Sequence, residues 1–321
     1  MSSSVSPVLS ATVREALARK RPVVALESSV LAQGLPIPEN RHAAERMQRA
    51  VQSAGAVPAI AAIARGRPVL GLEGADLERF LCREGVRKVS SRDLGVAIAE
   101  EADGATTVAA TLVLARAAGI QLFATGGIGG IHRRTSRDVE RSRQLRDESA
   151  DLPELARSRL IVVCAGAKSI LDLAATWERL ETLGIPVIGY RTDELPGFFT
   201  AETGITLNVR CDTASGIAAI ARSHWSIGNG QSVLVVQPPP SDCAMSGDEM
   251  QDVIDSALAE AEHKGIEGPK TTPFLLAAVS RLTKGQSLDV NLALLENNAA
   301  LAGEIASALT QQIGAAEGSQ N

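Results

Sequence analysis

Several side chains that could carry out chemistry stand at the ends of short apolar runs in this sequence. They are Glu27 after VVAL, Lys88 with Arg92 and Asp93 in the segment KVSSRD, Thr125 before GGIGGIH, and Lys168 after VVCAGA. A carboxylate can transfer protons, a half-buried lysine can lose its proton and become a nucleophile, and the backbone N–H groups of a glycine loop can bind an anion. If neighbouring strands bring these residues together, they form one site.

Each of these residues also has a purely structural explanation. Glu27 can cap the following loop, Lys168 can reach solvent or pair with Asp172, and the glycine loop can serve tight packing alone. The loop does not match nucleotide-binding patterns, because GxGxxG requires a glycine where His132 stands, and the segment 166–169 lacks the adjacent Gly and Lys of a phosphate loop. The residues by themselves therefore leave both interpretations open.

Residues that commonly bind metals are sparse and scattered. The chain contains four histidines and four cysteines: His42, His132, His224, His263, Cys82, Cys164, Cys211 and Cys243. Their spacing fits neither a structural zinc site nor a disulfide framework, so we expect reduced thiols. Asp147 and Asp151, in the segment DESAD, are hard-oxygen candidates for Mg²⁺ or Mn²⁺, although such a pair is also typical of an acidic surface turn.

Apolar runs alternate with helical patterns, and these predict the elements that must position the candidate residues. Expected strands are 23–26, 56–66, 67–72, 86–90, 120–125, 160–167, 185–190, 205–210 and 232–237, with the second and third forming a hairpin. Expected helices are 10–20, 39–54, 75–84, 104–118, 171–184, 213–225, 247–264, 272–283 and 289–312. The alternation predicts an α/β fold with three layers, α/β/α, and a mostly parallel central sheet, in which ligands bind at the carboxyl ends of strands.

No repeat or linker divides the chain, which indicates a single domain. We expect this domain to cover residues 10–312, with Ser10 as the cap of its first helix and flexible tails at 1–9 and 313–321. The segment 133–146 is strongly charged and is predicted to be a solvated helix or a surface excursion.

The composition excludes several classes of partner. Of the 321 residues, 45% are apolar and only 2% aromatic, so the core is aliphatic and few rings are available for stacking on single-stranded nucleic acid. A net charge of −5 provides no general attraction to nucleic acid or anionic membranes. No apolar run is long enough to span a membrane, and the N-terminus does not look like a secretory signal. We therefore expect a cytoplasmic protein without nucleic-acid or membrane partners.

Taken together, the motifs resemble a known family. The segments VVALESSVLAQGLPIPEN, KVSSRDL, GATTVAATL, FATGGIGGIHR, SADLPELA, VVCAGAKSILDL, TPFLLA and NNAALAGEIA are similar, in this order, to the pseudouridine-5′-phosphate glycosidases of the indigoidine synthase A-like family. The resemblance implies a carbon–oxygen lyase that reversibly converts pseudouridine 5′-phosphate and water into uracil and ribose 5-phosphate. It also implies a homotrimer with one divalent cation per subunit, typically Mn²⁺.

Residue roles are also implied by this resemblance. Lys168 matches the nucleophile that would form an imine with the ring-opened sugar, Glu27 matches the proton donor, and Asp147 matches the metal ligand. The implied substrate-binding positions are Lys88, Val108, Ser149, Ala150, Asp151, Thr125, His132 and Asn291. Val108 would act through its backbone. The chain departs from the family at the inserted segment 133–146 and at Gln33, where several relatives have His.

Three other functions compete with this interpretation. A ribokinase-like sugar kinase is suggested by GGIGG and the helical C-terminus, but it would need a catalytic Asp where this chain has Lys168. A class I aldolase would also use a strand-end lysine, within eight βα repeats that this sequence lacks. A non-catalytic sugar-phosphate-binding protein would have no need to keep both Glu27 and Lys168.

Overall fold

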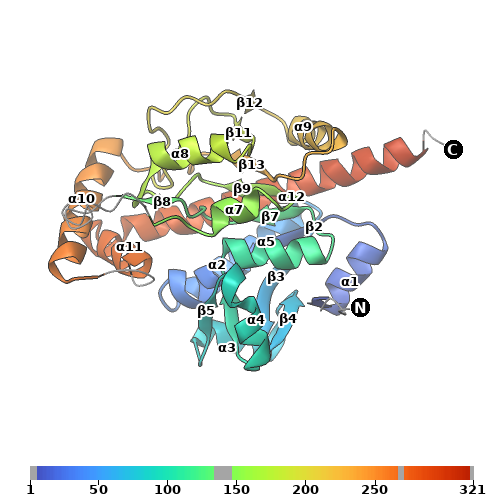
Figure 1. Ribbon diagram of the computed structural model, residues 1–321, viewed down its shortest axis with the longest axis horizontal. Coiled ribbons are helices and arrows are strands. Elements are labelled where there is room, and N and C mark those ends of the chain that lie inside the picture. Colours follow the sequence, from blue (N-terminus) through green and yellow to red (C-terminus); the bar gives the residue numbers. More distant parts are fainter. Residues whose placement is uncertain (1–5, 134–146, 267–270, 319–321) are drawn as a thin grey trace.

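The computed structural model describes residues 6–133, 147–266 and 271–318 (Figure 1). Within these residues, an 11-stranded sheet has the order β1-β4-β3-β2-β7-β9-β13-β11-β12, and β6 pairs with β3 and carries β5 at its other edge. The strands are β1 (Val8–Leu9), β2 (Val23–Glu27), β3 (Val57–Ala64), β4 (Arg67–Leu70), β5 (Arg87–Val89), β6 (Gly104–Thr106), β7 (Leu122–Ala124), β9 (Ile161–Cys164), β11 (Val187–Tyr190), β12 (Arg210–Cys211) and β13 (Val233–Val236). A separate antiparallel pair joins β8 (Ile131–His132) to β10 (Leu171–Asp172).

The sheet is mostly parallel, as its sequence pattern predicts. The central strands β2, β7, β9 and β13 run parallel to their neighbours and are buried at every residue, which explains their continuous apolar runs. The predicted hairpin is confirmed, because β3 pairs antiparallel with β4. Since β2, β7 and β9 lie side by side, their carboxyl ends come together at one edge of the sheet.

Helices cover both faces of the sheet (Figure 1). They are α1 (Ala11–Ala18), α2 (Glu39–Ser53), α3 (Gly74–Cys82), α4 (Leu94–Ala99), α5 (Val108–Ala117), α7 (Asp151–Leu155), α8 (Leu173–Thr182), α9 (Ala214–Ser226), α10 (Gly247–His263), α11 (Thr271–Leu282) and α12 (Gln286–Gly318), with the short turns η1 (Val30–Gly34) and η2 (Ser91–Asp93). The long α12 packs along β7 and β9 together with α2 and α9, and α5 and α7 lie on the opposite face. No helix among the described residues combines the length and apolarity needed to cross a membrane.

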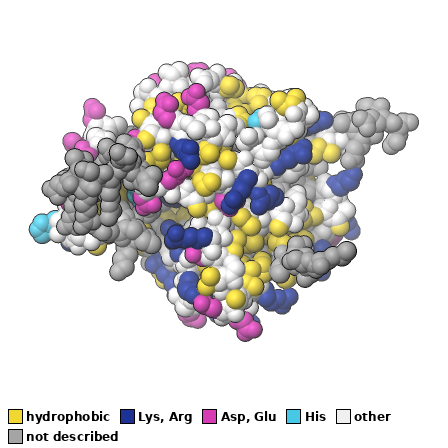
Figure 2. All heavy atoms as spheres, in the orientation of Figure 1, with side chains coloured by type: hydrophobic (Ala, Val, Ile, Leu, Met, Phe, Trp, Pro, Cys, Tyr) yellow, Lys and Arg dark blue, Asp and Glu magenta, His cyan; other side chains and the backbone are white. Residues whose placement is uncertain are grey.

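The aliphatic composition is visible in the core and on the surface. Buried Ala, Val, Leu and Ile side chains dominate the core, and Phe80 and Phe123 are its largest fully buried rings. On the face shown in Figure 2, the described Lys and Arg side chains lie among apolar and acidic ones, so no continuous patch of one charge covers that face.

Several internal elements differ from the sequence prediction. The helix expected at 171–184 begins with the two residues of β10, so α8 starts at Leu173, and the strand expected at 160–167 ends at Cys164. The segment 104–118 does not begin as a helix, because Gly104–Thr106 forms β6 and pairs with β3 before α5 starts at Val108. Ala62 and Ile63 of β3 provide that long-range pairing, which a helical periodicity cannot reveal. The strand expected at 205–210 is confined to Arg210–Cys211, beside β11.

The predicted tails are partly wrong. Val8–Leu9 forms β1 and pairs with β4, so the first tail contains an ordered strand. Ser10 then caps α1 by accepting a hydrogen bond from the Val13 N–H, as expected. At the other end, α12 continues to Gly318, past the boundary predicted at residue 312. The inserted segment is predicted to be a helix or a surface excursion, but its residues 134–146 lie outside the described ones.

Candidate active site

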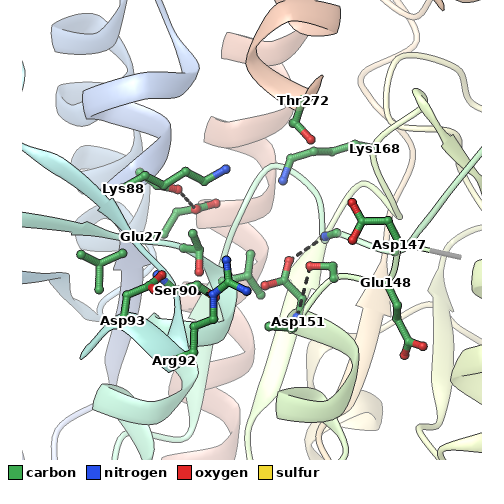
Figure 3. Close-up of a pocket in the computed structure, with 18 of the residues that line it drawn as sticks. Glu27, Lys88, Ser90, Arg92, Asp93, Asp147, Glu148, Asp151, Lys168 and Thr272 are labelled. Carbon is green, nitrogen blue, oxygen red and sulfur yellow. Dashed lines mark hydrogen bonds and ion pairs between the residues drawn. The ribbon is translucent and has the colours of Figure 1, made fainter. Parts of the chain in front are cut away.

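A cavity of about 660 Å³ lies at the carboxyl ends of β2, β7 and β9 (Figure 3). A second cavity of about 60 Å³ adjoins it, and the two share Glu27, Ser29, Lys88, Lys168 and Thr272 as a common wall. We call them the large and the small cavity. The candidate residues that stand far apart in the sequence therefore meet where parallel strands end, as the fold predicts.

Glu27 is the last residue of β2 and is held by two hydroxyl groups. Its side chain lies at the cavity wall and is 6% exposed. Ser29 Oγ donates a hydrogen bond of 2.6 Å to Oε2, and Thr125 Oγ1, from the end of the neighbouring β7, donates to Oε1. Because each carboxylate oxygen has its own donor, the plane of the carboxyl group is fixed before any substrate binds.

A buried amide network supports this carboxylate from behind. Asn298 of α12 donates to the backbone carbonyls of Thr125 and Gly126, at 2.8 and 3.3 Å. Its own oxygen accepts a hydrogen bond of 2.9 Å from Gln237, which follows β13. Asn298 and Gln237 are 1% and 5% exposed, so their amides can act only on the protein interior. The network therefore positions Thr125, and Thr125 positions Glu27.

Two lysines approach the carboxylate from different elements. Lys168 follows β9 and is half-buried, and Lys88 extends from β5; their ammonium groups both point into the cavity (Figure 3). Neither forms an ion pair with a described residue. Lys168 is anchored through its backbone, because its N–H donates to the Ile128 carbonyl of the glycine loop. The cavity thus contains two amines without a fixed counter-ion in the described chain.

Burial lowers the pKa of Lys88, and the ammonium group of Lys168 lowers it further. The carboxylates of Glu27 and Asp151 act in the opposite direction. Part of the Lys88 side chain remains exposed in the open cavity, so water screens these effects. An anionic ligand would remove the repulsion between the two lysines, which makes this part of the cavity suited to a phosphate group.

Asp151 joins the glycine loop to the start of α5. Its Oδ2 accepts a hydrogen bond of 2.8 Å from the Gly129 N–H, and its Oδ1 accepts one of 2.9 Å from the Ala109 N–H. Asp151 is 5% exposed, so although it lines the large cavity, its carboxylate is engaged mainly by the protein itself. A side chain at Gly129 would overlap Ser149 and Asp151, which explains the glycine there.

The glycine loop is less open to an anion than its sequence indicates. The Gly129 N–H is used by Asp151, and the Ile128 N–H donates to the Gly166 carbonyl. The backbone N–H groups of the glycine loop, which the sequence analysis considers for anion binding, are therefore partly used by internal hydrogen bonds. The first turn of α5 offers another backbone donor, since Val108 lines the large cavity directly after the helix cap Thr107.

Asp147 and His132 form the more open part of the large cavity. The Asp147 side chain is 68% exposed, and its Oδ2 lies 3.9 Å from His132 Nε2. Burial lowers the pKa of His132, Asp147 opposes this, and Lys168 and Lys88 lower it further. The described residues contain no group of three or more His, Cys, Asp or Glu that could hold a metal ion by themselves. One open carboxylate nevertheless suits Mg²⁺ or Mn²⁺ bound jointly by protein, water and substrate phosphate.

The structure places most of the predicted site residues on the two cavities. Those on the large cavity are Glu27, Lys88, Val108, His132, Asp147, Ser149, Ala150, Asp151 and Lys168. Asn291 lines the small cavity. Thr125 lines neither cavity: it is 1% exposed and lies behind Glu27, to which its hydroxyl donates a hydrogen bond.

Sequence reasoning missed several residues of the cavity wall. They are Ser29, Ser90, Thr107 and Thr272. Ser29 lies outside β2, which ends at Glu27, and it has helical dihedral angles just before η1, so the alternation of strand side chains could not place it at the cavity. Thr272 belongs to α11, and no local pattern could place it near β2.

Comparison with known proteins gives a consistent result for the sequence. The family model described as "Indigoidine synthase A like protein" matches residues 12–308. A pseudouridine-5′-phosphate glycosidase of Gemmatimonas aurantiaca is 57% identical, with 95% of this chain and 97% of the relative covered. The protein of the same name from Herpetosiphon aurantiacus is 47% identical, with coverage of 95% and 99%.

Solved structures show the same fold. The prealnumycin C-glycosynthase AlnA, in complex with ribulose 5-phosphate, has a TM-score of 0.87 and 39% identity, covering 97% of this chain and 99% of that one. An indigoidine synthase A-like protein from Thermotoga maritima has a TM-score of 0.84 and 35% identity, covering 95% and 97%. With a cavity built on Glu27 and Lys168 and with matches along nearly its whole length, the chain belongs to the indigoidine synthase A-like family.

Proposed function

We propose that the protein reversibly cleaves the C–C glycosidic bond of pseudouridine 5′-phosphate, giving uracil and ribose 5-phosphate. One observation carries the proposal: Glu27, as a held carboxylate, and Lys168, as a half-buried amine, line the wall shared by the two cavities. The relatives are named for this activity, and the neighbour AlnA is a C-glycosynthase with a bound sugar phosphate. A ribokinase-like kinase lacks any such support.

The residues suit a carbon-linked base. An ordinary oxocarbenium route would require a carbon to leave as an anion, and a lysine avoids this. Glu27 takes a proton from the Lys168 ammonium group and gives it to the ring oxygen as the C1′–O4′ bond breaks, while the freed amine bonds to C1′. The nitrogen then gives a second proton to Glu27, and its electron pair forms the C1′–N double bond as the C1′–C5 bond breaks. The electron pair of the broken bond stays with uracil, and Glu27 gives the second proton to C5. The imine left on Lys168 is hydrolysed by water to release ribose 5-phosphate.

The two cavities can divide the substrate between them. The large cavity has room for the sugar and its phosphate, with Lys88 and the start of α5 at Val108 as the cationic and backbone donors. The small cavity is lined by Val30, Phe198 and Leu276, which suit the faces of a planar base. Glu27 and Lys168 would then stand beside the bond that joins sugar to base.

Asp147 is the residue that would hold a divalent cation, Mn²⁺ in this proposal. Its open carboxylate and the nearby His132 are hard or borderline donors, and water and the phosphate would complete the shell. The cation would supply charge that orients the sugar phosphate. Chelation is expected to suppress turnover and Mn²⁺ to restore it, whereas unchanged turnover by exhaustively metal-free protein would contradict the metal role. We further propose a homotrimer that works in the cytoplasm.

The experiment that tests the activity is incubation with pseudouridine 5′-phosphate and Mn²⁺, following uracil release. In parallel, borohydride treatment in the presence of ribose 5-phosphate should add the mass of the sugar to the peptide that contains Lys168. Lys168→Ala should remove the adduct and nearly all turnover.

The second amine of the cavity provides the matched control for the adduct. Lys88→Met should keep the adduct on Lys168, because Lys88 is proposed to bind phosphate and not C1′. Label on Lys88, or full activity of Lys168→Ala, would overturn the assignment. If the wild-type protein binds ribose 5-phosphate but releases no uracil, the chain is a sugar-phosphate-binding protein instead.

A further inference from the structure

Lys168 stands in a tight turn between β9 and β10, and hydrogen bonds of its own backbone help to fix that turn. Its N–H donates to the Ile128 carbonyl at 3.1 Å, and its carbonyl accepts from the Leu171 N–H at 2.9 Å. The amine lies at the end of a flexible four-carbon side chain. A shift of the turn would therefore move the amine within the cavity.

The side chain of Arg133 holds the same turn from outside. Its Nε donates a hydrogen bond of 3.1 Å to the Leu171 carbonyl, and its Nη2 donates one of 3.2 Å to the Ser169 carbonyl. A guanidinium group is planar and its donors point in fixed directions, so two carbonyls that bind it are kept at a fixed separation. Arg133 directly follows β8, which pairs with β10. The turn of Lys168 is thus attached to the segment that carries His132.

The guanidinium group also contacts α10, which lies beside β8 in Figure 1. Nη1 is 3.6 Å from Asp255 Oδ1, and Nη2 donates a hydrogen bond of 3.4 Å to Gln251 Oε1. Gln251 Nε2 donates in turn to Asp255 Oδ1 at 2.7 Å. The Asp255 side chain is 60% exposed, so water weakens its attraction to Arg133, whose side chain is 25% exposed. The two carbonyls of the turn are therefore the main partners of the guanidinium group, and α10 steadies it.

Arg133 lines neither cavity. Its contacts among the described residues go to the turn that carries Lys168 and to α10, so it can affect the reaction only through the residues that it holds. We propose that Arg133 is a positioning residue that keeps the amine of Lys168 within reach of C1′ of the sugar. This inference rests on the proposed function, because Lys168 is the nucleophile only if that function is correct.

The expected effect is on the rate and not on the binding of the sugar phosphate. A displacement of about 1 Å can cost about 100-fold in rate when reacting atoms must meet in one geometry. The phosphate is proposed to bind at Lys88 and at the start of α5, and the contacts of Arg133 go to neither of them. Removing the guanidinium group should therefore lower kcat by about 10- to 100-fold and leave the affinity for a sugar phosphate unchanged.

The test uses Arg133→Ala and three measurements. The kcat for pseudouridine 5′-phosphate and the rate at which borohydride traps the ribose 5-phosphate adduct should both fall by about 10- to 100-fold. The affinity for 1,4-anhydroribitol 5-phosphate, a sugar phosphate that cannot open its ring or form an imine, should change by less than about threefold. A fall in this affinity as large as the fall in kcat would place Arg133 in substrate binding and overturn the inference.

Chemical rescue separates positioning from a general loss of packing. Free guanidinium at millimolar concentration, far below the denaturing range, can occupy the space of the missing group and donate to the same carbonyls. It should restore most of the lost kcat of Arg133→Ala and leave the wild-type rate unchanged. Urea has the same planar shape but no charge, so it should restore much less. A folded Arg133→Ala variant that guanidinium does not rescue would contradict the proposal.

Arg281→Ala is the matched control. Arg281 also pairs with α10, through Glu260, but this contact does not involve the turn of Lys168. Its kcat should stay within about threefold of wild type, and guanidinium should have no effect on it.

Arg133→Lys decides the question if Arg133→Ala does not fold. Lysine keeps the charge but lacks the planar fork, so it cannot hold both carbonyls in the same way. Its kcat should fall about tenfold while the ring-closed analogue still binds. An unchanged kcat in Arg133→Lys would then overturn the inference.

Failure of the proposed function would give a different result. If the wild-type protein releases no uracil from pseudouridine 5′-phosphate and forms no adduct with ribose 5-phosphate, both proposals are wrong. If the wild-type protein is active and Arg133→Ala keeps its kcat, only the positioning role of Arg133 is wrong.

Discussion

Two groups of residues at the large cavity contrast with each other. The Glu27 side is Glu27 together with the three residues behind it, Thr125, Asn298 and Gln237. Each of the four residues is at most 6% exposed, and each forms a hydrogen bond with another of them. On the Asp147 side, comprising Asp147, His132 and Glu148, the side chains keep contact with water, and Asp147 is 68% exposed. One side is fixed before substrate arrives, and the other has capacity left for a ligand.

This difference separates two tasks that a site must perform. A group that exchanges a proton must be held at a set distance and angle, and a buried network does this at no cost during the reaction. A group that binds a cation and a phosphate must exchange water for ligand, and an exposed carboxylate can do so readily. The comparison predicts that changes on the Glu27 side reduce the rate, while changes on the Asp147 side disturb binding as well.

The largest effect is expected from Glu27→Gln. The variant keeps the shape of the side chain, and the hydroxyls of Ser29 and Thr125 can rotate to accommodate an amide, but it cannot exchange a proton. We expect kcat to fall by about 10²–10⁴-fold with little change in substrate affinity. Steady-state kinetics and direct binding of ribose 5-phosphate measure the two quantities separately.

Glu148→Gln is the matched control for this variant. Glu148 is a carboxylate on the same cavity, but its Oε1 pairs with Arg179 at 2.9 Å. We expect a change in kcat below about threefold, as for other surface ion pairs of small energy. A loss below tenfold in Glu27→Gln with unchanged affinity would reduce Glu27 to a positioning residue and remove the contrast between the two sides.

The next effect is expected from Gly129→Ala, which disturbs the attachment of the Asp147 side. The new methyl group would overlap Ser149 and Asp151, so the turn that carries them must shift. We expect a loss of about 1–3 kcal/mol in the free energy of unfolding, as for overpacking elsewhere, together with a raised KM. Gly230→Ala is the control, because nothing lies within 4 Å of a methyl group there. If the two variants have the same free energy of unfolding and the same KM, the two hydrogen bonds that Asp151 accepts do not position the Asp147 side.

A smaller effect is expected from Thr125→Val on the Glu27 side. Valine has nearly the same shape, but it removes the hydroxyl that donates to Glu27 Oε1. We expect kcat to fall about tenfold, the equivalent of one charge-assisted hydrogen bond, with the KM and the borohydride adduct retained. Thr125→Ser should restore the rate, which a general loss of packing would not allow. A raised KM with unchanged kcat would place Thr125 in substrate binding after all.

The smallest effect on stability is expected from Lys88→Met. Folding lowers the pKa of Lys88 below its ordinary 10.5, so the charged lysine destabilises the fold. This destabilisation is fully present below the folded pKa and disappears as the pH rises toward the unfolded value. The variant should therefore melt about 1 °C higher than wild type at pH 7, with the difference vanishing near pH 10.5. A lower melting temperature at pH 7 would show that attraction to Glu27 and Asp151 outweighs the loss of hydration.

Much of the fold follows from local patterns in the sequence. The runs VVAL and LIVVC contain no polar residue, whereas a half-buried strand would alternate apolar and polar residues. They therefore indicate fully buried strands, and they form β2 and β9 at the centre of the sheet. Segment 104–118 shows the limit of such patterns, because three of its residues form β6 by pairing with β3. A strand of three residues carries too little periodicity to be recognised without its partner.

For the site, too, some features can be predicted from the sequence and others depend on the tertiary structure. The sequence by itself determined that a carboxylate ends one buried strand and that a lysine follows another, because apolar runs and residue types are local properties. Only the tertiary structure decided that Thr125 supports Glu27 and that Asp151 ties the glycine loop to α5. It also decided that Asn298 bonds to Thr125 and Gly126, which precede it by 173 and 172 positions in the sequence. These contacts depend on strand order and helix packing, which no short segment encodes. The physical reason is that hydrogen bonds are directional over a few ångströms, so their partners are set by how the whole chain packs.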